Sequence, residues 1–420
     1  MSKNFRWIIV SLLFLATTIN YLDRQIIGLL KPILEKELNW SESDFAFIVS
    51  AFTAAYAAGL LGFGWLIDRI GTKAGYSISV AFWSLMGMLH AATRTVFGFS
   101  LARIGLGLGE AGNFPAGMKA VSEWFPKRER ALAAGIFNSG TSVGVVLALL
   151  ITPWILVTLG WKQVFIITGA MGFVWLAFWL WLYDVPAKKK SLSKEERDLI
   201  AEGACKTSAS KNKPVKWFRL FIFPQTWAFI FGKLLIDPIF WFFLFWLPSY
   251  FSSTFQLDLK KPSIELMIIY SATTLGSIGG GYLSSLLIKR GTAPLQARNA
   301  VLFVFAVLEL SIVFAQFVTN VWAAVALISL AVAVHQAWAT NIFTTASDMF
   351  PKETVSSVVG IGGTAGALGG ILFPIFVGYL LDTYNLRSYL KSLAFDSHTH
   401  VNRCWTAYIC GARPQQEKNF

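Results

Sequence analysis

Long apolar stretches separated by short polar segments dominate the chain. A window of about 19 residues identifies eleven of them: 7–30, 45–67, 74–93, 96–118, 131–157 and 162–183, then, after a polar gap, 225–251, 264–288, 299–318, 320–346 and 355–381. Glycine, proline and charged residues lie in the breaks, as at helix ends. The apolar residues do not alternate at every second position, as strands of a membrane barrel would. The pattern therefore predicts six membrane-spanning helices, a polar connector and five more spans.

Composition agrees with a membrane protein and argues against a soluble enzyme, a disordered chain and a nucleic-acid binder. Hydrophobic residues make up 55% of the 420 positions and charged residues 14%, whereas soluble chains carry about 25% charged residues. Three unpatterned cysteines and four scattered histidines argue against a disulfide framework and a metal centre. The first apolar stretch is too long for a signal peptide and contains Asp23 and Arg24, so we interpret it as a span.

The positions of the positive charges explain the formal net charge of +13. If the N-terminus is cytoplasmic, the segments on that side contain far more Lys and Arg than the loops on the other side. Cytoplasmic loops of membrane proteins carry such an excess, so the charge requires no nucleic-acid partner. Residues 185–219 hold many of these cations, and they predict a cytoplasmic connector with one amphipathic helix that starts near Ser193.

The two groups of spans share an internal repeat. Ser-Glu-Trp-Phe-Pro-Lys at 122–127 recurs as Ser-Asp-Met-Phe-Pro-Lys at 347–352. Glycines match at the same spacing: Gly135 with Gly360, and Gly144 with Gly369. Phe-Pro-Lys alone could recur wherever a helix leaves the membrane, but the matching glycines favour a true repeat. Parallel repeats of six spans are one of the standard plans of secondary transporters.

Two segments resemble signatures of the major facilitator superfamily. Gly-Trp-Leu-Ile-Asp-Arg-Ile-Gly-Thr-Lys at 64–73 is similar to its signature between the second and third spans, and 103–115 resembles its fourth-span signature. Further segments resemble the anion:cation symporter branch, which includes hexuronate, sugar-acid, glutamate and sialic-acid carriers: 20–24, 124–130, and Lys233 with Asp237-Pro238. The stretch 233–248 is most similar to the hexuronate carriers, and the resemblance extends from about residue 5 to 383.

The resemblance implies an all-α integral membrane protein with the major facilitator fold, built from two six-helix bundles. A last span of the second bundle is not recognised, because residues 384–420 contain no apolar run long enough to cross a membrane. Either the chain has eleven spans, or its end is not the usual end of the family. The expected parts are an N-terminal bundle at 1–184, a linker at 185–219, a C-terminal bundle at 220–383 and an atypical polar tail at 384–420. We expect a monomer in a bacterial inner membrane that needs no cofactor or metal.

Three of the predicted spans each carry two of six charged residues, and each charge costs about 2.5–3.5 kcal/mol on insertion scales. They are Asp23 and Arg24 on the first span, Arg103 and Glu110 on the fourth, and Lys233 and Asp237 on the seventh. One interpretation is structural ion pairing that only neutralises the charges. The other is coupling: once Asp23 and Glu110 are protonated the cavity becomes positive, so proton and anion binding favour each other.

The resemblance also implies roles for these residues. Arg24 is expected to bind the substrate carboxylate through its guanidinium fork, and Lys233 to make a second anion contact. Asp23 and Glu110 are the expected proton sites, and Arg103 is the expected partner of Glu110.

Uncharged candidates complete the site. The expected substrate contacts are Tyr21, Tyr56, Thr141, His335, Gln336, Trp338 and Asn341, although polar residues also join membrane helices to one another. We interpret His335 as a hydrogen-bonding wall residue rather than a proton site. Asp68, Arg69 and Gly71 are expected to form a cytoplasmic gate, with a simple tight turn at Gly71 as the alternative. Glu309 lies in the middle of a span, and no partner for it follows from the sequence.

These observations predict a secondary active transporter rather than an enzyme. The expected activity is proton-coupled symport of an organic anion, a hexuronate (galacturonate or glucuronate) or a related sugar acid, by alternating access. The partners would be this anion, protons and the lipid bilayer. Two alternatives remain open: a sodium-coupled carrier of another carboxylate, and a transporter-like sensor that binds the anion without moving it, although no signalling domain is present in the sequence.

Overall fold

The computed structural model describes residues 4–189, 192–202, 217–255 and 263–383, and every element in these ranges is helical. The amino-terminal half comprises α1 (Phe5–Leu38), α2 (Glu42–Ile70), α3 (Thr72–Leu89), η1 (His90–Ala92), α4 (Val96–Glu110), α5 (Asn113–Trp124), α6 (Lys127–Leu159) and α7 (Trp161–Leu182). The connector contributes α8 (Lys194–Glu202). The carboxy-terminal half comprises η2 (Trp217–Ile222), α9 (Pro224–Phe255), α10 (Ile264–Lys289), α11 (Pro294–Glu309), η3 (Leu310–Phe317), α12 (Val321–Met349) and α13 (Val355–Thr383).

All eleven predicted spans are confirmed as helical, with two interruptions that the apolar pattern did not indicate. The fourth span is divided into α4 and α5 at Ala111 and Gly112, and the ninth changes from α-helix to 3-10 helix at Leu310. Of the described helices, seven are long and apolar enough to cross a membrane by length and composition alone. The predicted polar tail lies outside the described residues, so the missing last span stays a prediction.

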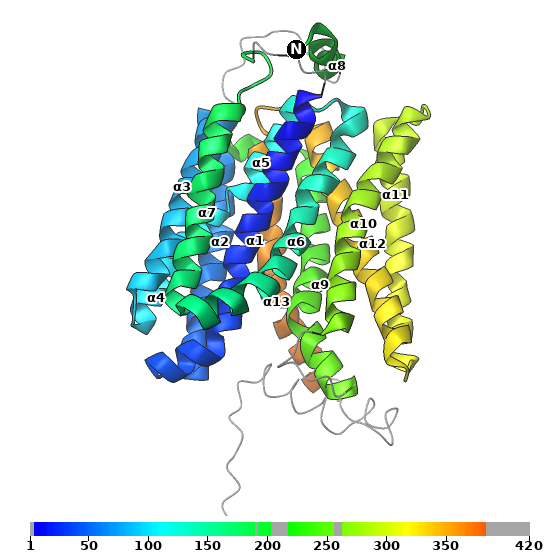
Figure 1. Ribbon diagram of the computed structural model, residues 1–420. Helices are drawn as coiled ribbons and strands as arrows, with labels where there is room; N and C mark the ends of the chain where they lie inside the picture. The colour runs from blue at the N-terminus through cyan, green and yellow to red at the C-terminus, as the bar shows by residue number, and fades with distance from the viewer. Residues whose placement is uncertain (1–3, 190–191, 203–216, 256–262, 384–420) are drawn as a thin grey trace, which may run out of the picture.

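The amino terminus and α8 lie at the same end of the helix bundle, here called the connector end (Figure 1). The connector helix begins at Lys194, as predicted, and is fixed to α1 by Glu196. The Glu196 carboxylate accepts hydrogen bonds from the backbone N–H groups of Phe5 and Arg6, at 3.2 and 3.0 Å. A carboxylate at a helix N-terminus accepts hydrogen bonds from unpaired backbone N–H groups and interacts favourably with the positive end of the helix dipole.

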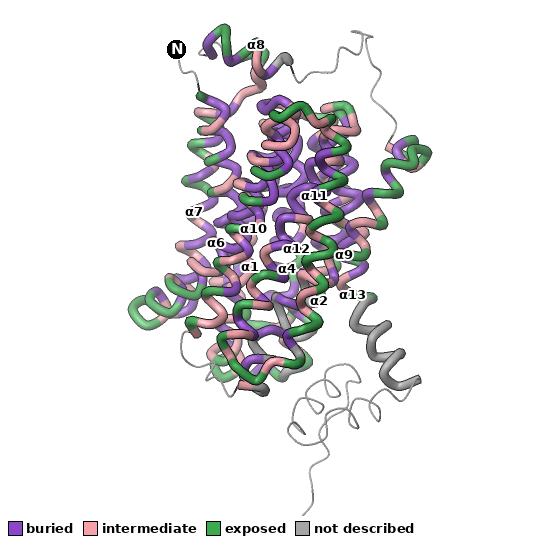
Figure 2. The backbone as a smooth tube through the Cα atoms, turned by 90° about the vertical axis from the view of Figure 1, so that its right-hand side faces the viewer, coloured by how far each residue is buried: buried purple, intermediate pink, exposed green. Residues whose placement is uncertain are grey.

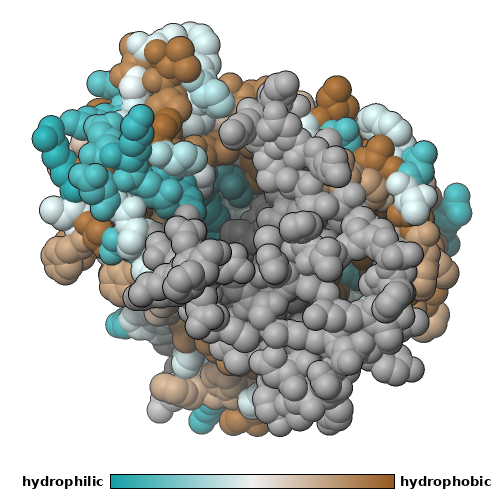
Figure 3. Space-filling model, turned by 90° about the horizontal axis from the view of Figure 1, so that it is seen from below, coloured by the Kyte–Doolittle hydropathy of each residue, from teal (hydrophilic) through white to brown (hydrophobic). Residues whose placement is uncertain are grey.

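Buried residues lie mainly in the middle of the bundle, and exposed residues lie mainly on its outside (Figure 2). Phe97, Val157 and Leu235 are among the large apolar side chains left open on the outside. At the end opposite the connector, hydrophobic side chains lie along the rim of the molecule (Figure 3). An apolar outer surface on a helical bundle is what lipid requires, because lipid tails offer no hydrogen bonds.

The predicted repeat recurs in the helix packing. Gly135 on α6 contacts α10, where an added Cβ atom would lie 2.4 Å from the Ser277 carbonyl oxygen. Its repeat partner Gly360 on α13 contacts α2, where an added Cβ atom would lie 2.2 Å from the Leu60 carbonyl oxygen. Both glycines therefore sit where the two halves of the molecule touch, and both are required by close backbone approach.

The second pair of matching glycines behaves in the same way within each half. A Cβ atom at Gly144 on α6 would lie 2.4 Å from the Thr18 carbonyl oxygen of α1, and one at Gly369 on α13 would lie 2.4 Å from the Leu234 carbonyl oxygen of α9. Equivalent glycines thus make equivalent contacts in the two halves, which supports a duplicated structural unit.

Candidate functional site

The centre of the candidate site is an ion pair between α1 and α4. Arg24 donates from Nε and Nη2 to Oε2 of Glu110, at 3.0 and 2.9 Å. The guanidinium lies over the rings of Tyr21 and Tyr56, with its carbon 4.7 and 4.5 Å from their centroids. Arg24 is thus held between one carboxylate and two aromatic faces, an arrangement that favours a cation. Sequence analysis named all four residues, and the structure brings them together.

Two further predicted residues lie beside this pair and lack hydrogen bonds to it. Asp23 is 3% exposed and Arg103 is 2% exposed. Neither Asp23 carboxylate oxygen, nor Nε or Nη2 of Arg103, has a hydrogen-bond partner among the described residues. Arg103 lies within electrostatic range of Asp23 and Glu110. Buried polar atoms without partners are rare in proteins.

Arg103, the expected tuning partner of Glu110, makes no hydrogen bond to it among the described residues, and its tuning role stays a prediction. The carboxylate of Glu110 bonds Arg24 instead, and Arg103 lies over the Phe52 ring at 5.6 Å. Seven residues span about 10.5 Å along a helix, so Arg103 starts far from Glu110 on the same helix. Arg24 approaches Glu110 from the neighbouring helix and makes the shorter contact.

The carboxy-terminal half contributes a second ion pair. Lys233 donates from Nζ to Oδ1 of Asp237, at 2.6 Å along α9. The same Nζ lies 4.1 Å from the Phe343 ring centroid, and Phe343 stacks on Phe114 of the other half at 5.2 Å. Asp237 is also close enough to Tyr21 to interact with it electrostatically. The charged residues predicted on the first, fourth and seventh spans therefore face one region between the halves.

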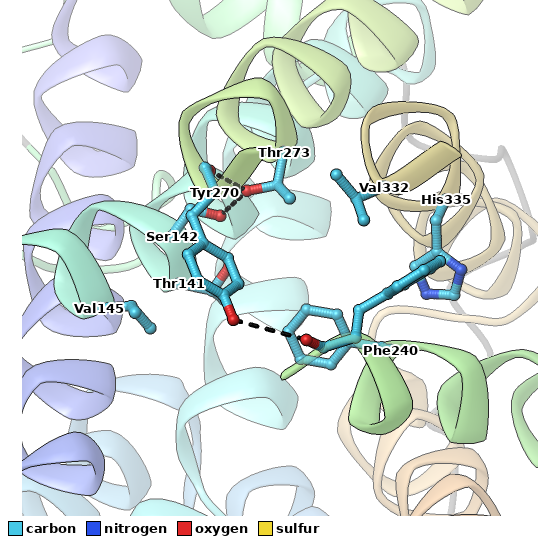
Figure 4. Close-up of a pocket in the computed structure, with 9 residues that line it drawn as sticks. Thr141, Ser142, Val145, Phe240, Tyr270, Thr273, Val332 and His335 are labelled. Atoms are coloured by element: carbon cyan, nitrogen blue, oxygen red, sulfur yellow. Dashed lines mark hydrogen bonds between the residues drawn. The ribbon is translucent and has the colours of Figure 1, made fainter. Parts of the chain in front are cut away.

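The uncharged candidates divide into two groups. Thr141 and His335 line a narrow pocket between α6, α9, α10 and α12 (Figure 4). Gln336 and Asn341 instead hold helices together: Asn138 donates to Gln336 Oε1 at 2.9 Å across the halves, and Asn341 donates to the Gly280 carbonyl of α10 at 3.1 Å.

Trp338 is half-buried and packs against the apolar core. Its role as a substrate contact stays a prediction, as do those of Gln336 and Asn341.

Glu309, for which the sequence indicated no partner, pairs with His335. Its Oε1 lies 2.8 Å from Nδ1 of His335. Glu309 is the last residue of α11 and His335 lies in the middle of α12, so the contact joins two helices at membrane depth. Both residues were visible in the sequence as polar groups within spans, but their proximity was not.

The predicted gate residue Asp68 connects the halves at the connector end. Its carboxylate accepts from Lys119 Nζ at 2.8 Å and from the backbone N–H of Ser357, in the first turn of α13, at 2.7 Å. Helix N-termini favour such anions. Arg69 does not join this contact and lies over the Trp65 ring at 5.2 Å. Gly71 has φ of 89° between α2 and α3, a conformation that favours glycine.

A second contact at this end was not anticipated. Asp348 accepts from Arg130 of α6 at 3.1 Å and from Arg298 of α11 at 3.2 Å. Arg298 also donates to the Lys127 carbonyl at 3.2 Å, so the cluster ties the halves together twice. A signal for it was present in the repeat, where Asp348 matches Glu123.

The loop between α12 and α13 adds a half-buried cation, Lys352, to the connector end. Lys352 donates to the Glu123 carbonyl at 3.5 Å, across the halves. Burial lowers the pKa of the Lys352 ammonium, and the nearby Arg130 lowers it further. Keeping Lys352 charged therefore costs free energy, and the nearby carboxylates of Glu123 and Glu353 offset part of this cost.

The helical fold, with buried charged residues between its two halves, is typical of a membrane transporter. The chain belongs to the major facilitator superfamily, because the sequence model of the Major Facilitator Superfamily matches residues 13–374. The fold is similar to that of a proton:xylose symporter of this superfamily, bound to 6-bromo-6-deoxy-D-glucose, with a TM-score of 0.68, 17% identity and coverage of 96% of this chain and 93% of that one.

The sequence is similar to several sugar-acid transporters. The hexuronate transporter of Escherichia coli (strain K12) is 32% identical over 394 residues, which cover 93% of this chain and 91% of the relative. The galacturonate transporter of Dickeya chrysanthemi is 33% identical over 68% of this chain and 84% of its own length. The probable galactarate/D-glucarate transporter of Escherichia coli (strain K12) is 30% identical over 93% of this chain and 91% of its own length. The protein is thus a multi-pass membrane transporter related to sugar-acid carriers, and not an enzyme.

Proposed function

We propose that the protein is a proton-coupled symporter of a sugar acid, with a hexuronate such as galacturonate or glucuronate as its substrate. The observation that carries this proposal is the buried ion pair between Arg24 and Glu110, at 2.9 Å. Relatives named for hexuronate and galacturonate transport support the choice of substrate.

The ion pair supplies a competition that couples the two ligands. While Glu110 is ionised, its carboxylate occupies the guanidinium fork that a substrate carboxylate would use. Once Glu110 takes a proton, the charge that neutralises Arg24 is gone, and the guanidinium is free to bind an anion. Asp23, buried nearby with Arg103 in electrostatic range, is the second proton site in this proposal.

The contacts at the connector end fit one state of an alternating-access cycle. Asp68 and Asp348 each tie the amino-terminal half to the carboxy-terminal half at that end. We take this end to be cytoplasmic, from the distribution of Lys and Arg, and the conformation to be closed toward the cytoplasm. Opening to the cytoplasm then requires both carboxylates to lose their partners in the other half.

Uptake into proteoliposomes tests the proposal. Labelled galacturonate, glucuronate and galactonate are offered with and without an inward proton gradient, and in a separate arm with an inward sodium gradient. We expect accumulation of a hexuronate driven by the proton gradient and abolished by a protonophore. Accumulation that follows the sodium gradient alone would assign the coupling to sodium, and binding without movement of any labelled acid would favour a sensor.

A further inference from the structure

We propose that His335 and Glu309 form a specificity-determining pair that selects sugar monoacids and discriminates against sugar diacids. The inference rests on the proposed function, because it assigns the end of the substrate that Arg24 does not hold. The relatives leave this choice open, since their names include both hexuronates and the diacids galactarate and D-glucarate. The juxtaposition that carries it is an imidazole fixed by a carboxylate at the wall of a narrow pocket.

The pair is buried and tightly oriented. The side chain of His335 is 2% exposed and that of Glu309 is 12% exposed. On the other side, the imidazole stacks on Phe240, with centroids 6.1 Å apart and an interplanar angle of 11°. Phe243 contacts it edge-on at 6.2 Å. A histidine held by one carboxylate and two aromatic rings has little freedom to turn, so its second nitrogen keeps a fixed direction.

Hydrogen-bond chemistry then determines what the second nitrogen can recognise. An ionised Glu309 only accepts hydrogen bonds, so the Nδ1 atom of His335 carries the proton and donates it at 2.8 Å. In the neutral ring the Nε2 atom is consequently an acceptor. Among the described residues, the hydrogen bond seen for the ring is the one from Nδ1 to Glu309, and the residue lines the pocket. A substrate hydroxyl can donate to Nε2, whereas an ionised carboxylate, which has no proton to donate, cannot.

The described lining of the pocket offers no cation to a second carboxylate. Of the described residues that line it, none is Lys or Arg. The polar groups near His335 are hydroxyls, from Thr141 and Ser142 of α6 and Tyr270 and Thr273 of α10 (Figure 4). The nearest charge behind the imidazole is Glu309, which repels an anion. A hydroxyl-bearing end therefore fits this wall better than a charged one.

The pocket is placed to receive the far end of a molecule held at Arg24. Gly144 of α6 packs on α1, where an added Cβ atom would lie 2.9 Å from Cβ of Tyr21. Tyr21 lies beneath the Arg24 guanidinium, and the pocket residues Thr141 and Val145 flank Gly144 on α6. The two sites are thus separated by one helix contact. The pocket has room for about one or two water molecules, enough for a hydroxyl group but not for a sugar ring.

The test uses two acids that differ at one end only. Galactonate and galactarate are open-chain acids with the same four inner hydroxyl groups, but galactonate ends in a hydroxymethyl group and galactarate in a second carboxylate. Each is used to inhibit counterflow of labelled galacturonate in proteoliposomes at pH 7.5 without a gradient. We expect galactonate to inhibit at a concentration at least about tenfold lower, because a site built to bind a hydroxyl strongly rejects analogues without one.

Two variants then assign the discrimination to the pair. In Glu309→Gln the amide can donate to Nδ1, which allows the proton to move to Nε2, and this N–H can then donate a hydrogen bond to a carboxylate. In His335→Gln the new side chain offers both a donor and an acceptor. In both variants we expect the inhibitory concentration of galactarate, divided by that of galactonate, to fall toward one. The matched control is His90→Gln, which removes a buried histidine that bonds the Met86 carbonyl and lies outside this pocket, and we expect it to keep the wild-type ratio.

The outcomes separate this inference from the proposed function. If no labelled sugar acid exchanges at all, the proposed function fails. If galacturonate exchanges but the wild-type protein is inhibited equally by both acids, or not by galactonate, the inference is overturned while the function stands. Unchanged discrimination in folded Glu309→Gln and His335→Gln proteins would also overturn it. The comparison of the two acids on the wild-type protein needs no variant. It therefore still tests the inference if either variant fails to fold.

Discussion

Replacing Glu110 with Gln tests whether this carboxylate couples proton to substrate. The substitution keeps the shape of the side chain and imitates its protonated state, so Arg24 loses its competitor permanently. We expect the Glu110→Gln protein to bind substrate with little pH dependence and to exchange it across the membrane. It should fail to concentrate substrate against a gradient, because no proton accompanies the anion.

The size of the effect follows from the contact that the substrate must displace. Arg24 donates two hydrogen bonds to Glu110 Oε2, at 3.0 and 2.9 Å. A hydrogen bond to a charged group contributes about 1.5–3 kcal/mol, and each 1.4 kcal/mol is tenfold in affinity. The amide oxygen of the variant can still accept one of these bonds. With one bond lost, and above the pH at which Glu110 ionises, the variant should bind substrate about 10- to 100-fold more tightly than the wild type. Below that pH the two should converge.

The measurement combines binding and transport on the same purified protein. Substrate affinity is measured at pH 5.5 and pH 8 by calorimetry, and counterflow and pH-driven uptake are measured after reconstitution. The matched control is Glu129→Gln, because Glu129 also accepts from a buried arginine, Arg6, at 2.9 Å, but at the connector end. We expect this control to keep the pH dependence of the wild type.

Two results would contradict this reasoning. Full pH-driven accumulation by Glu110→Gln would show that the proton is carried elsewhere and would leave Asp23 as the coupling residue. Loss of folding and exchange together would indicate a structural ion pair, since breaking a buried pair costs about 3–5 kcal/mol. The melting temperature of the detergent-solubilised protein distinguishes this second case.

Three further predictions concern the clamp, the connector-end contact and the topology. We expect Arg24→Ala to fold but to lose substrate binding in calorimetry, and tight binding by the folded variant would make Lys233 the next candidate. Asp348→Asn should weaken the contact with Arg130 by about 1–3 kcal/mol. We therefore expect a longer distance between spin labels placed at the connector ends of α6 and α10. Unchanged distances would exclude a gating role for Asp348. For the topology, we use a variant that keeps Cys205, which lies outside the described residues, and lacks the other two cysteines. We expect Cys205 to resist an impermeant thiol reagent in intact cells. Labelling of Cys205 would show that the connector is on the outside.

The helices were predictable because each span is a long apolar run with polar breaks. Every predicted stretch lies on a described helix, and the connector helix begins one residue after Ser193, near its predicted start. The break between α4 and α5 was not predictable from this signal. Ala111 and Gly112 interrupt the helix without interrupting the apolar pattern, since neither residue is polar.

Ion pairs were predictable only within one helix. Lys233 and Asp237, four residues apart, share a helix face and form the expected contact at 2.6 Å. The partner of Glu110 was missed because Arg24 lies on another helix, and sequence spacing contains no information about which helices are neighbours. The same limit hid Asp348 and its two arginines, although the repeat had already aligned Asp348 with Glu123.

The pair of Glu309 and His335 shows a further limit of sequence analysis, which does not predict the level along the membrane normal at which each residue lies. α11, η3 and α12 run up and down around a turn near Asn320, so residues pair across them when they lie equally far from that turn. From Val321 to His335 the α-helix rises about 21 Å. The eight residues of η3 would rise about 12 Å as α-helix but rise about 16 Å as 3-10 helix. Because the 3-10 helix rises more per residue, Glu309 lies nearer to the level of His335 than it would in a continuous α-helix. Only a sequence signal for this local 3-10 helix could have indicated the contact.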